Sequence, residues 1–248
     1  MLFRSNIASR LISGNVTALV YGWLFMQVPE TIIGTAIATA LLPTLSEQMA
    51  RGEQDAYRLS LSRTIQVILA LTIPIAALVA FVLRPVVAIL GFNEAGLDLV
   101  LWTARLYLLG LVGHALLDVV VRAFYAQQDA RTPLLTAVLT TIAFIILALL
   151  LGFPLGAPGI ALANALAFSG EALLLLYLLS RRFPGLLQVK RTLLRAALAA
   201  ALAAGLAYLI LSLPLAIPAL LQAVLAAGVG GLAILPFIWP EVKILIKL

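Results

Sequence analysis

Three groups of polar residues interrupt long apolar stretches of the sequence at spacings that repeat along a helix. They are Trp23, Gln27 and Glu30; His114, Asp118 and Arg122; and Asn164 and Glu171. Spacings of three, four, seven or eight residues place side chains on the same face of an α-helix. Carboxyl, imidazole and guanidinium groups on such faces could bind a proton or a phosphate group.

A charged group at the centre of a membrane-spanning helix costs roughly 2.5–3.5 kcal/mol, so it usually faces a partner or a cavity. The polar groups could therefore form separate contacts between helices, with Asp118 and Arg122 as a local ion pair. Alternatively, the three faces could line one hydrated cavity, an interpretation favoured by their occurrence together in a small bundle. In that cavity Glu30, Asp118 and Glu171 are candidates for a proton-binding group, because burial favours the neutral carboxyl.

The cavity interpretation makes a geometric prediction. Glu30 and His114 each lie about fifteen residues into segments expected to run parallel, which at about 1.5 Å per residue puts them at similar depth. The first polar group should therefore face the second, with Arg122 closer to the cytoplasm. Asn164 and Glu171 should face the same region or the adjacent helix contact.

The composition indicates that these faces belong to a membrane protein. Of the 248 residues, 64% are hydrophobic and only 10% are charged, and the mean hydropathy is +1.16. A soluble domain carries roughly a quarter charged residues, so a cytosolic enzyme, a nucleic-acid-binding domain and a disordered protein are excluded as default classes. The formal net charge of +6 is typical of cytoplasmic loops and contacts with lipid headgroups.

Seven segments are long and apolar enough to cross a membrane, and they predict an all-α transmembrane bundle. They are, approximately, residues 16–45, 64–83, 97–126, 133–152, 156–180, 193–213 and 216–239. Pro29 and Pro74 should bend the first and second of these helices, because proline removes a backbone donor from the helix interior.

Every second connection between these segments is basic. The basic connections are 46–63, 127–132, 181–195 and the tail 241–248, which with the adjacent Arg122 hold twelve of the 16 Lys and Arg residues. By the positive-inside rule, these connections and the C-terminus are expected in the cytoplasm and the start of the first span outside. Because no signal peptide accompanies that outside start, we expect a further segment upstream.

The sequence lacks the residues of several other kinds of site. It contains no Cys and a single histidine, so neither a thiolate nor a His-rich metal centre is expected. No nucleophile–His–acid set and no acidic metal cluster is found, so we expect neither an enzyme nor a cofactor. The small-residue stretches 196–205 and 228–231 follow no strand and indicate close helix packing rather than a phosphate-binding loop.

One segment carries a family signature. Residues 122–133, RAFYAQQDARTP, resemble the RAFYA-x-x-D-x-RTP signature of the MurJ (MviN) lipid II flippases, which belong to the MOP exporter superfamily. The segments 8–19, 28–46 and 159–166 fit the same family in order. The resemblance implies a protein of fourteen spans, arranged as two six-span lobes followed by two extra C-terminal spans.

By this resemblance the chain corresponds to the C-terminal half: a remnant of a preceding span at 1–15, a bundle at 16–183 and two additional helices at 184–248. The implied activity is transport of the undecaprenyl-pyrophosphate-linked peptidoglycan precursor across the bacterial cytoplasmic membrane by alternating access. The headgroup is expected in a cationic cavity that includes the eight polar residues, and the lipid tail along the last two helices. The implied partners are this precursor, membrane lipids and a separate N-terminal lobe.

The chain departs from the family at particular positions. Family members usually carry an Arg five residues before the Pro of the Val-Pro pair, where this sequence has Leu24. The Asn and Asp through which some members bind sodium fall on Phe144 and Ala148. Two alternatives therefore stay open: another MOP-type exporter, for a lipid-linked oligosaccharide or a drug, and a non-transporting membrane partner of a full flippase.

Overall fold

The computed structural model describes residues 14–214 and 217–245, and within these ranges every regular element is a helix. The elements are α2 (Asn15–Glu30), the π-helical turn η1 (Thr31–Thr35), α3 (Ala36–Ala50), α4 (Gln54–Ala88), α5 (Glu94–Leu109), α6 (Leu111–Ala126), α7 (Arg131–Leu155), α8 (Ala157–Arg182), α9 (Lys190–Ser212) and α10 (Ala219–Leu245). They form seven segments that are long and apolar enough to cross a membrane, with α2–η1–α3 and α5–α6 each counting as one. The predicted all-α bundle of seven spans is confirmed.

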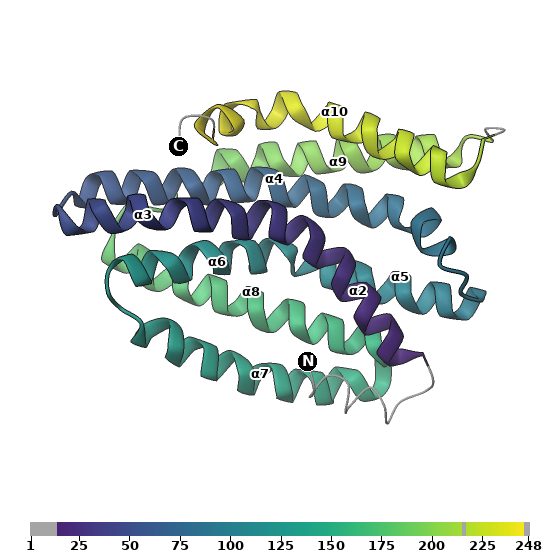
Figure 1. Cartoon of the computed structure of the whole chain (residues 1–248), viewed down its shortest axis with the longest axis horizontal. Coiled ribbons are helices and arrows are strands. Elements are labelled where there is room, and N and C mark those ends of the chain that lie inside the picture. The colour runs from purple at the N-terminus through teal and green to yellow at the C-terminus, as the bar shows by residue number, and fades with distance from the viewer. Residues whose placement is uncertain (1–13, 215–216, 246–248) are drawn as a thin grey trace.

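Successive spans run in opposite directions, so the connections alternate between the two ends of the bundle (Figure 1). The α3–α4, α6–α7 and α8–α9 connections and the end of α10 gather at one end, on the left of Figure 1. All described Lys and Arg residues except Arg84 and Arg105 lie in the half of the bundle at this end, which we call the basic end. The basic connections therefore alternate with the direction of the spans, as predicted from the sequence. A cytoplasmic location for the basic end stays a prediction.

The second span is longer than its apolar run predicts. Helix α4 begins at Gln54, about ten residues before the expected start, and continues through Pro74 and Pro85. Tyr57 and Leu61, one turn apart in the added segment, are both fully buried. Although this added segment is mostly polar, it carries an apolar stripe that packs into the bundle. This packing explains why the helix begins before the hydrophobic run.

The first span bends where Pro29 predicts a bend. Pro29 cannot donate a backbone hydrogen bond one turn back along α2. The chain responds with the π-helical turn η1, in which the backbone N–H of Ala36 donates to the carbonyl of Thr31, five residues earlier. Helices α2 and α3 meet at this turn at a visible angle (Figure 1). Such π-helical turns are common at functional sites.

The third span is divided into two helices rather than one. Helix α5 ends at Leu109, and α6 begins after Gly110. A Cβ atom at Gly110 would lie 2.9 Å from the Cα of Ala165 in α8, and one at Gly113 would lie 2.7 Å from the Cα of Ser169. The two glycines allow α5 and α6 to cross α8 at backbone contact, which accounts for their place in an otherwise bulky segment.

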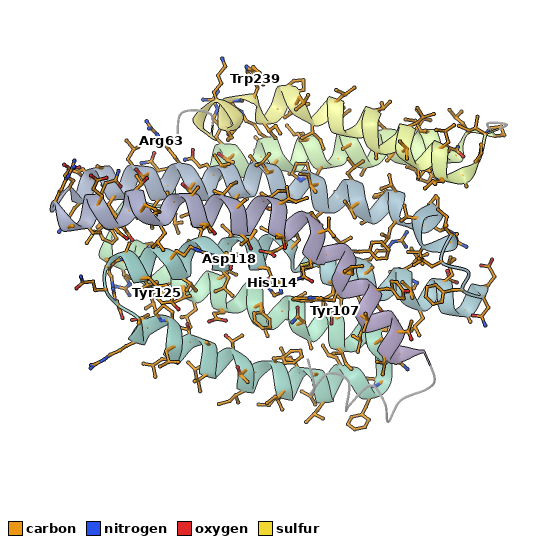
Figure 2. All side chains as sticks on the ribbon, in the orientation of Figure 1. Arg63, Tyr107, His114, Asp118, Tyr125 and Trp239 are labelled. Atoms are coloured by element: carbon orange, nitrogen blue, oxygen red, sulfur yellow. The ribbon has the colours of Figure 1, made fainter. Side chains whose placement is uncertain are left out.

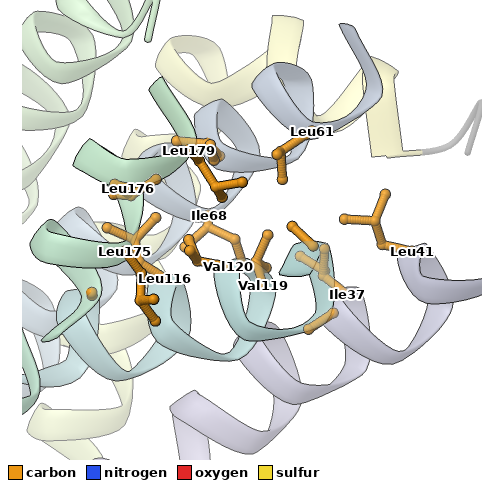
Figure 3. Close-up of a cluster of buried hydrophobic side chains, with 14 of the residues drawn as sticks. Ile37, Leu41, Leu61, Ile68, Leu116, Val119, Val120, Leu175, Leu176 and Leu179 are labelled. Atoms are coloured by element: carbon orange, nitrogen blue, oxygen red, sulfur yellow. The ribbon is translucent and has the colours of Figure 1, made fainter. Parts of the chain in front are cut away.

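Three apolar clusters hold the helices together. The first joins α3, α4, α6 and α8, with Leu41, Leu61, Val119 and Leu179 among its buried side chains (Figure 3). The second joins α2, α5, α7 and α8 near the opposite end. The third combines alanines with Leu78, Val82, Ile234 and Ile238 where α9 and α10 pack along α4. These two helices form a separate layer on the bundle (Figure 1).

Candidate functional site

Two carboxyl groups from different spans meet at one threonine. The Oγ1 atom of Thr35, in η1, lies 2.8 Å from Oδ2 of Asp118 in α6 and 3.2 Å from Oε1 of Glu30 in α2. A hydroxyl group has one hydrogen to donate. Both contacts are therefore satisfied together only when one carboxyl is protonated and donates its own hydrogen to the hydroxyl oxygen.

Arg122 lies one turn beyond Asp118, toward the basic end. Its Nη1 atom lies 3.5 Å from Oδ1 of Asp118 and donates to the Asp118 backbone carbonyl at 2.9 Å. Its Nη2 atom is 3.5 Å from the Thr39 hydroxyl in α3. The predicted local pair between Asp118 and Arg122 therefore exists, and it also bridges two spans.

His114 lies one turn from Asp118 in the other direction (Figure 2). Its Nε2 atom is 3.0 Å from Oδ1 of the fully buried Asn164 in α8. Its ring stacks on Phe168 at 4.7 Å and meets the edge of Trp23 at 5.6 Å, measured between ring centroids. The imidazole thus joins α2, α6 and α8.

Two of the sequence-predicted residues lie outside these contacts. Glu171 is buried in the contact between α8 and α7, where its Oε1 accepts a hydrogen bond of 3.2 Å from the Thr136 hydroxyl. Gln27 is exposed, one turn before the bend. The structure therefore brings Trp23, Glu30 and the second polar group together with Asn164, and it places Glu171 in a separate pairing between helices.

The face that carries Glu30 and Asp118 is partly open. The side chains of Asp118 and Arg122 are 34% and 23% exposed, and Thr31 and Thr39 are exposed beside them. Such groups within a membrane-spanning segment need water or a polar partner, because lipid cannot satisfy their hydrogen bonds. We call this surface, formed by Gln27, Glu30, Thr31, Thr35, Thr39, Asp118 and Arg122, the polar face.

Sequence reasoning missed the hydroxyl groups of this face. Thr35 is five residues after Glu30, a spacing that an α-helix turns well away from the carboxyl. The π-helical turn widens the helix by about one residue and brings the two side chains back to one side. The sequence TIIGT that follows Pro29 was the available signal.

Comparison with known proteins assigns the chain to a family. Residues 1–224 match the family model of the lipid II flippase MurJ. The chain belongs to the MurJ family. It is 32% identical over 207 residues to a probable lipid II flippase MurJ of Rhizobium meliloti (strain 1021), covering 79% of this chain and 38% of that protein. It is 33% identical over 143 residues to the lipid II flippase MurJ of Burkholderia cenocepacia, covering 56% of this chain and 28% of that protein.

Solved structures share the fold. A lipid II flippase MurJ in an inward closed conformation matches with a TM-score of 0.80 and 22% identity, over 98% of this chain and 50% of that one. A MATE structure in a bent conformation matches with a TM-score of 0.65 and 15% identity, over 97% of this chain and 61% of that one. The chain therefore spans about half the length of the solved MurJ protein, and a smaller share of the curated MurJ relatives.

The MurJ-like signature around α6 and α7 builds a second polar network, at the basic end. Asp129 accepts hydrogen bonds from the backbone N–H and the hydroxyl of Thr132, at 3.0 and 2.8 Å, and an ion pair of 2.7 Å from Arg182. The Arg182 guanidinium also lies over the Phe124 ring, 4.9 Å from its centroid. The Thr132 N–H, together with Arg182, lowers the pKa of Asp129 to about 2. The signature thus fixes the α6–α7 connection to the end of α8.

Three positions at which the resemblance leads us to expect a departure from the family pattern have clear places in the fold. Leu24 is half exposed on α2, one turn from Gln27. Phe144 and Ala148 are buried on one face of α7, in the apolar cluster that joins α7 to α2, α5 and α8. Apolar side chains at these two positions offer no ligand atoms to a cation.

Proposed function

We propose that this chain forms one lobe of a lipid II flippase, corresponding to the C-terminal half, and that its polar face lines the transport pathway. The single observation that carries the proposal is this face within membrane-spanning segments of a MurJ-family chain. An open surface with two carboxyls and a guanidinium at membrane depth is costly unless a hydrated cleft covers it. A flippase requires such a cleft for the headgroup of its cargo.

The cargo we propose is the undecaprenyl-pyrophosphate-linked peptidoglycan precursor. Arg122 is the guanidinium of the polar face, and its contact with the Asp118 carboxylate is long enough, at 3.5 Å, to exchange for a phosphate. Trp23 and Gln27 are positioned to contact sugar and peptide groups. Asn164 contributes by holding the His114 ring in place through their hydrogen bond. Glu171 contributes by joining α7 to α8.

Glu30 and Asp118 are our candidates for the group that couples transport to a proton. Two carboxylates that share one hydroxyl hydrogen repel each other unless one is protonated. Binding a cationic or hydrogen-bonding group of the cargo would release that proton. No catalytic step is proposed for this chain, because the cargo crosses the membrane without a covalent change.

The second half of the pathway must come from another lobe. The match to solved MurJ covers half of that protein, and two lobes that rock about a site near the bilayer midplane are a general design of transporters. We propose that the basic end and the C-terminus face the cytoplasm of a bacterial cell, following the positive-inside rule. The precursor's lipid tail would lie along the α9–α10 layer.

The rival functions make different predictions in one experiment. A bacterium depleted of its flippase is given this chain alone, or with the N-terminal lobe of a MurJ relative, and growth is measured. We expect no rescue by the chain alone and rescue by the pair, with loss of rescue when Asp118→Ala is introduced. Rescue by the chain alone would refute the lobe proposal, and inhibition of an intact flippase by the chain would favour the non-transporting partner. Export of a drug or another glycolipid without growth rescue would favour a different MOP-type exporter.

A further inference from the structure

A groove between α4 and α5, at the end of the bundle opposite the basic end, combines apolar walls with one guanidinium. It has a volume of about 420 Å³ and is lined by Ala80, Phe81, Trp102, Arg105, Leu106 and Leu109. Trp102 and Leu109 are 57% and 66% exposed, so the groove opens to the surroundings of the bundle. Its apolar walls suit a hydrocarbon chain rather than a water-soluble ligand.

Arg105 lines this groove and makes one hydrogen bond with the residues that the structure describes. Its Nε atom donates to the carbonyl of Ala80 at 3.2 Å, and its guanidinium lies 5.5 Å from the centroid of the Trp102 ring. None of the ion pairs among the described residues includes Arg105. Arg84, on the same side of the bundle, instead pairs with Glu94 and Asp98, at 3.6 and 3.4 Å. No carboxylate in the described part of the chain therefore compensates the positive charge of Arg105.

The position of Arg105 along the helix matches the edge of a bilayer. The α5–α6 span has 33 residues and is about 50 Å long at 1.5 Å per residue, whereas the hydrocarbon core is about 30 Å thick. If the span is centred, roughly 10 Å extends beyond the core at each end. Arg105 lies about 16 Å from the start of α5, so its long side chain can reach the headgroup level from just inside the core. Trp102, one turn nearer the end, is at the level that tryptophan prefers.

We propose that this groove binds an anionic phospholipid in the leaflet opposite the basic end. The lipid phosphate accepts hydrogen bonds from the free Nη atoms of Arg105, because a guanidinium presents paired donors that match two phosphate oxygens. An acyl chain lies along Phe81, Leu106 and Leu109. The proposal requires only that the chain is embedded in a bilayer, and it is independent of the flippase proposal.

A purely structural role for Arg105, as a link from α5 to the Ala80 carbonyl of α4, is the competing possibility. The two roles differ in what they require of the side chain. The lipid site requires a positive charge, which Arg105→Lys retains and Arg105→Gln removes. The structural link requires an N–H donor at the ε position, which the amide of Arg105→Gln retains and Arg105→Lys loses.

Brominated lipids can measure occupancy of the groove. The chain, with Trp23→Phe and Trp239→Phe so that Trp102 is its single tryptophan, is reconstituted in phosphatidylcholine vesicles that contain either brominated phosphatidylglycerol or brominated phosphatidylcholine. Quenching of Trp102 fluorescence gives the relative affinity of the two lipids. We expect a preference of about fivefold for phosphatidylglycerol. This preference should persist in Arg105→Lys, and in the control Arg51→Gln at the basic end, and fall to about one in Arg105→Gln.

Several outcomes would overturn the lipid site. Equal quenching by the two brominated lipids in the protein with Arg105 intact would do so, whether or not the Arg105→Gln variant folds. An unchanged preference in a folded Arg105→Gln variant would contradict the role of the guanidinium, and loss of the preference in Arg105→Lys would favour the structural link. Inorganic phosphate at 50 mM should leave the quenching unchanged, since displacement by phosphate alone would show a site for free anions instead of a lipid.

Discussion

The hydroxyl of Thr35 and the carboxylate of Asp118 are 2.8 Å apart across the contact between η1 and α6. Their contact depends on the closeness of the two backbones, because a Cβ atom at Gly34 would lie 2.9 Å from the Cα of Ala115. The bend that Pro29 introduces and the glycine that follows it therefore place a hydroxyl between two carboxyls. A helix without that bend would direct Thr35 elsewhere.

Removing the Thr35 hydroxyl should destabilise the protein modestly and disturb the polar face. We expect Thr35→Val to reduce the free energy of unfolding by about 1 kcal/mol, the scale of a hydrogen bond between membrane helices. Unfolding in mixed detergent and dodecyl sulfate micelles measures this change. Thr141→Val is the matched control, because among the described residues the Thr141 hydroxyl bonds to a carbonyl of its own helix alone. Equal stability of the two variants would show that the Thr35 bridge contributes nothing.

The sequence was sufficient to predict the spans, because a run of about 20 apolar residues rarely occurs outside a membrane-spanning helix. It also placed Glu30 near Asp118, since both positions follow simple helical spacing. It could not place Thr35, whose orientation depends on the π-helical turn, nor the break at Gly110, which depends on the surface of α8. The seven-residue spacing predicts one shared face for Asn164 and Glu171, but α6 supplies the partner of Asn164 and α7 supplies the partner of Glu171. Local spacing determines the face of a helix, whereas helix crossings determine what covers that face.

The close crossing of α6 and α8 should tolerate no side chain at Gly113. A Cβ atom there would lie 2.7 Å from the Cα of Ser169, so Gly113→Ala must push the helices apart. We expect a loss of about 1–3 kcal/mol in unfolding free energy, as for overpacked cores. Gly170→Ala is the control, because open space surrounds that position and alanine favours helix. Stability of Gly113→Ala equal to the control would contradict the crossing.

The Asp129 network should make part of the stability sensitive to acid. The folded protein holds the pKa of Asp129 at about 2, below its ordinary value of 3.8, so the stabilisation is complete above pH 4 to 5 and disappears as the pH falls toward 2. The difference in melting temperature between the wild type and Asp129→Asn should thus be constant from pH 7 to pH 5 and narrow between pH 4 and pH 2. A difference that stays constant down to pH 2, or narrows as the pH rises, would refute this assignment.

The two adjacent arginines at the end of α8 should behave differently. Arg182 contacts Asp129, Gln127 and the Phe124 ring on other elements, whereas Arg181 bonds to Tyr177 of its own helix. We expect Arg182→Ala to lower the unfolding free energy by roughly 1 kcal/mol and Arg181→Ala to change it by less than half of that, because exposed pairs within one helix contribute little. Proteolysis of the α6–α7 connection would report the same difference as faster cleavage in Arg182→Ala. Equal effects of the two substitutions would show that the signature network does not fix this connection.

Water should reach the polar face but not the neighbouring apolar residues Val28 and Ile32. The sequence contains no cysteine, so single cysteines can be introduced without altering any other residue. Gln27→Cys, Thr31→Cys and Thr39→Cys place a thiol on the polar face. Val28→Cys and Ile32→Cys are matched controls, because these residues are 55% and 69% exposed and we expect these apolar side chains to face lipid.

In membranes, a charged thiol reagent reacts with the thiolate, which forms readily only in water. We therefore expect the three polar-face cysteines to react at least tenfold faster than the two controls. The lobe proposal further predicts that binding of the cargo's pyrophosphate headgroup slows the reaction of the polar-face cysteines. If both sets react equally slowly, the polar face is sealed by helix contacts or lipid, and the interpretation as separate pairings between helices would replace the hydrated cavity. If both sets react equally fast, the α2–α3 span is not embedded as its apolar length predicts. The comparison isolates hydration because all five residues are exposed on the same span and meet the same reagent.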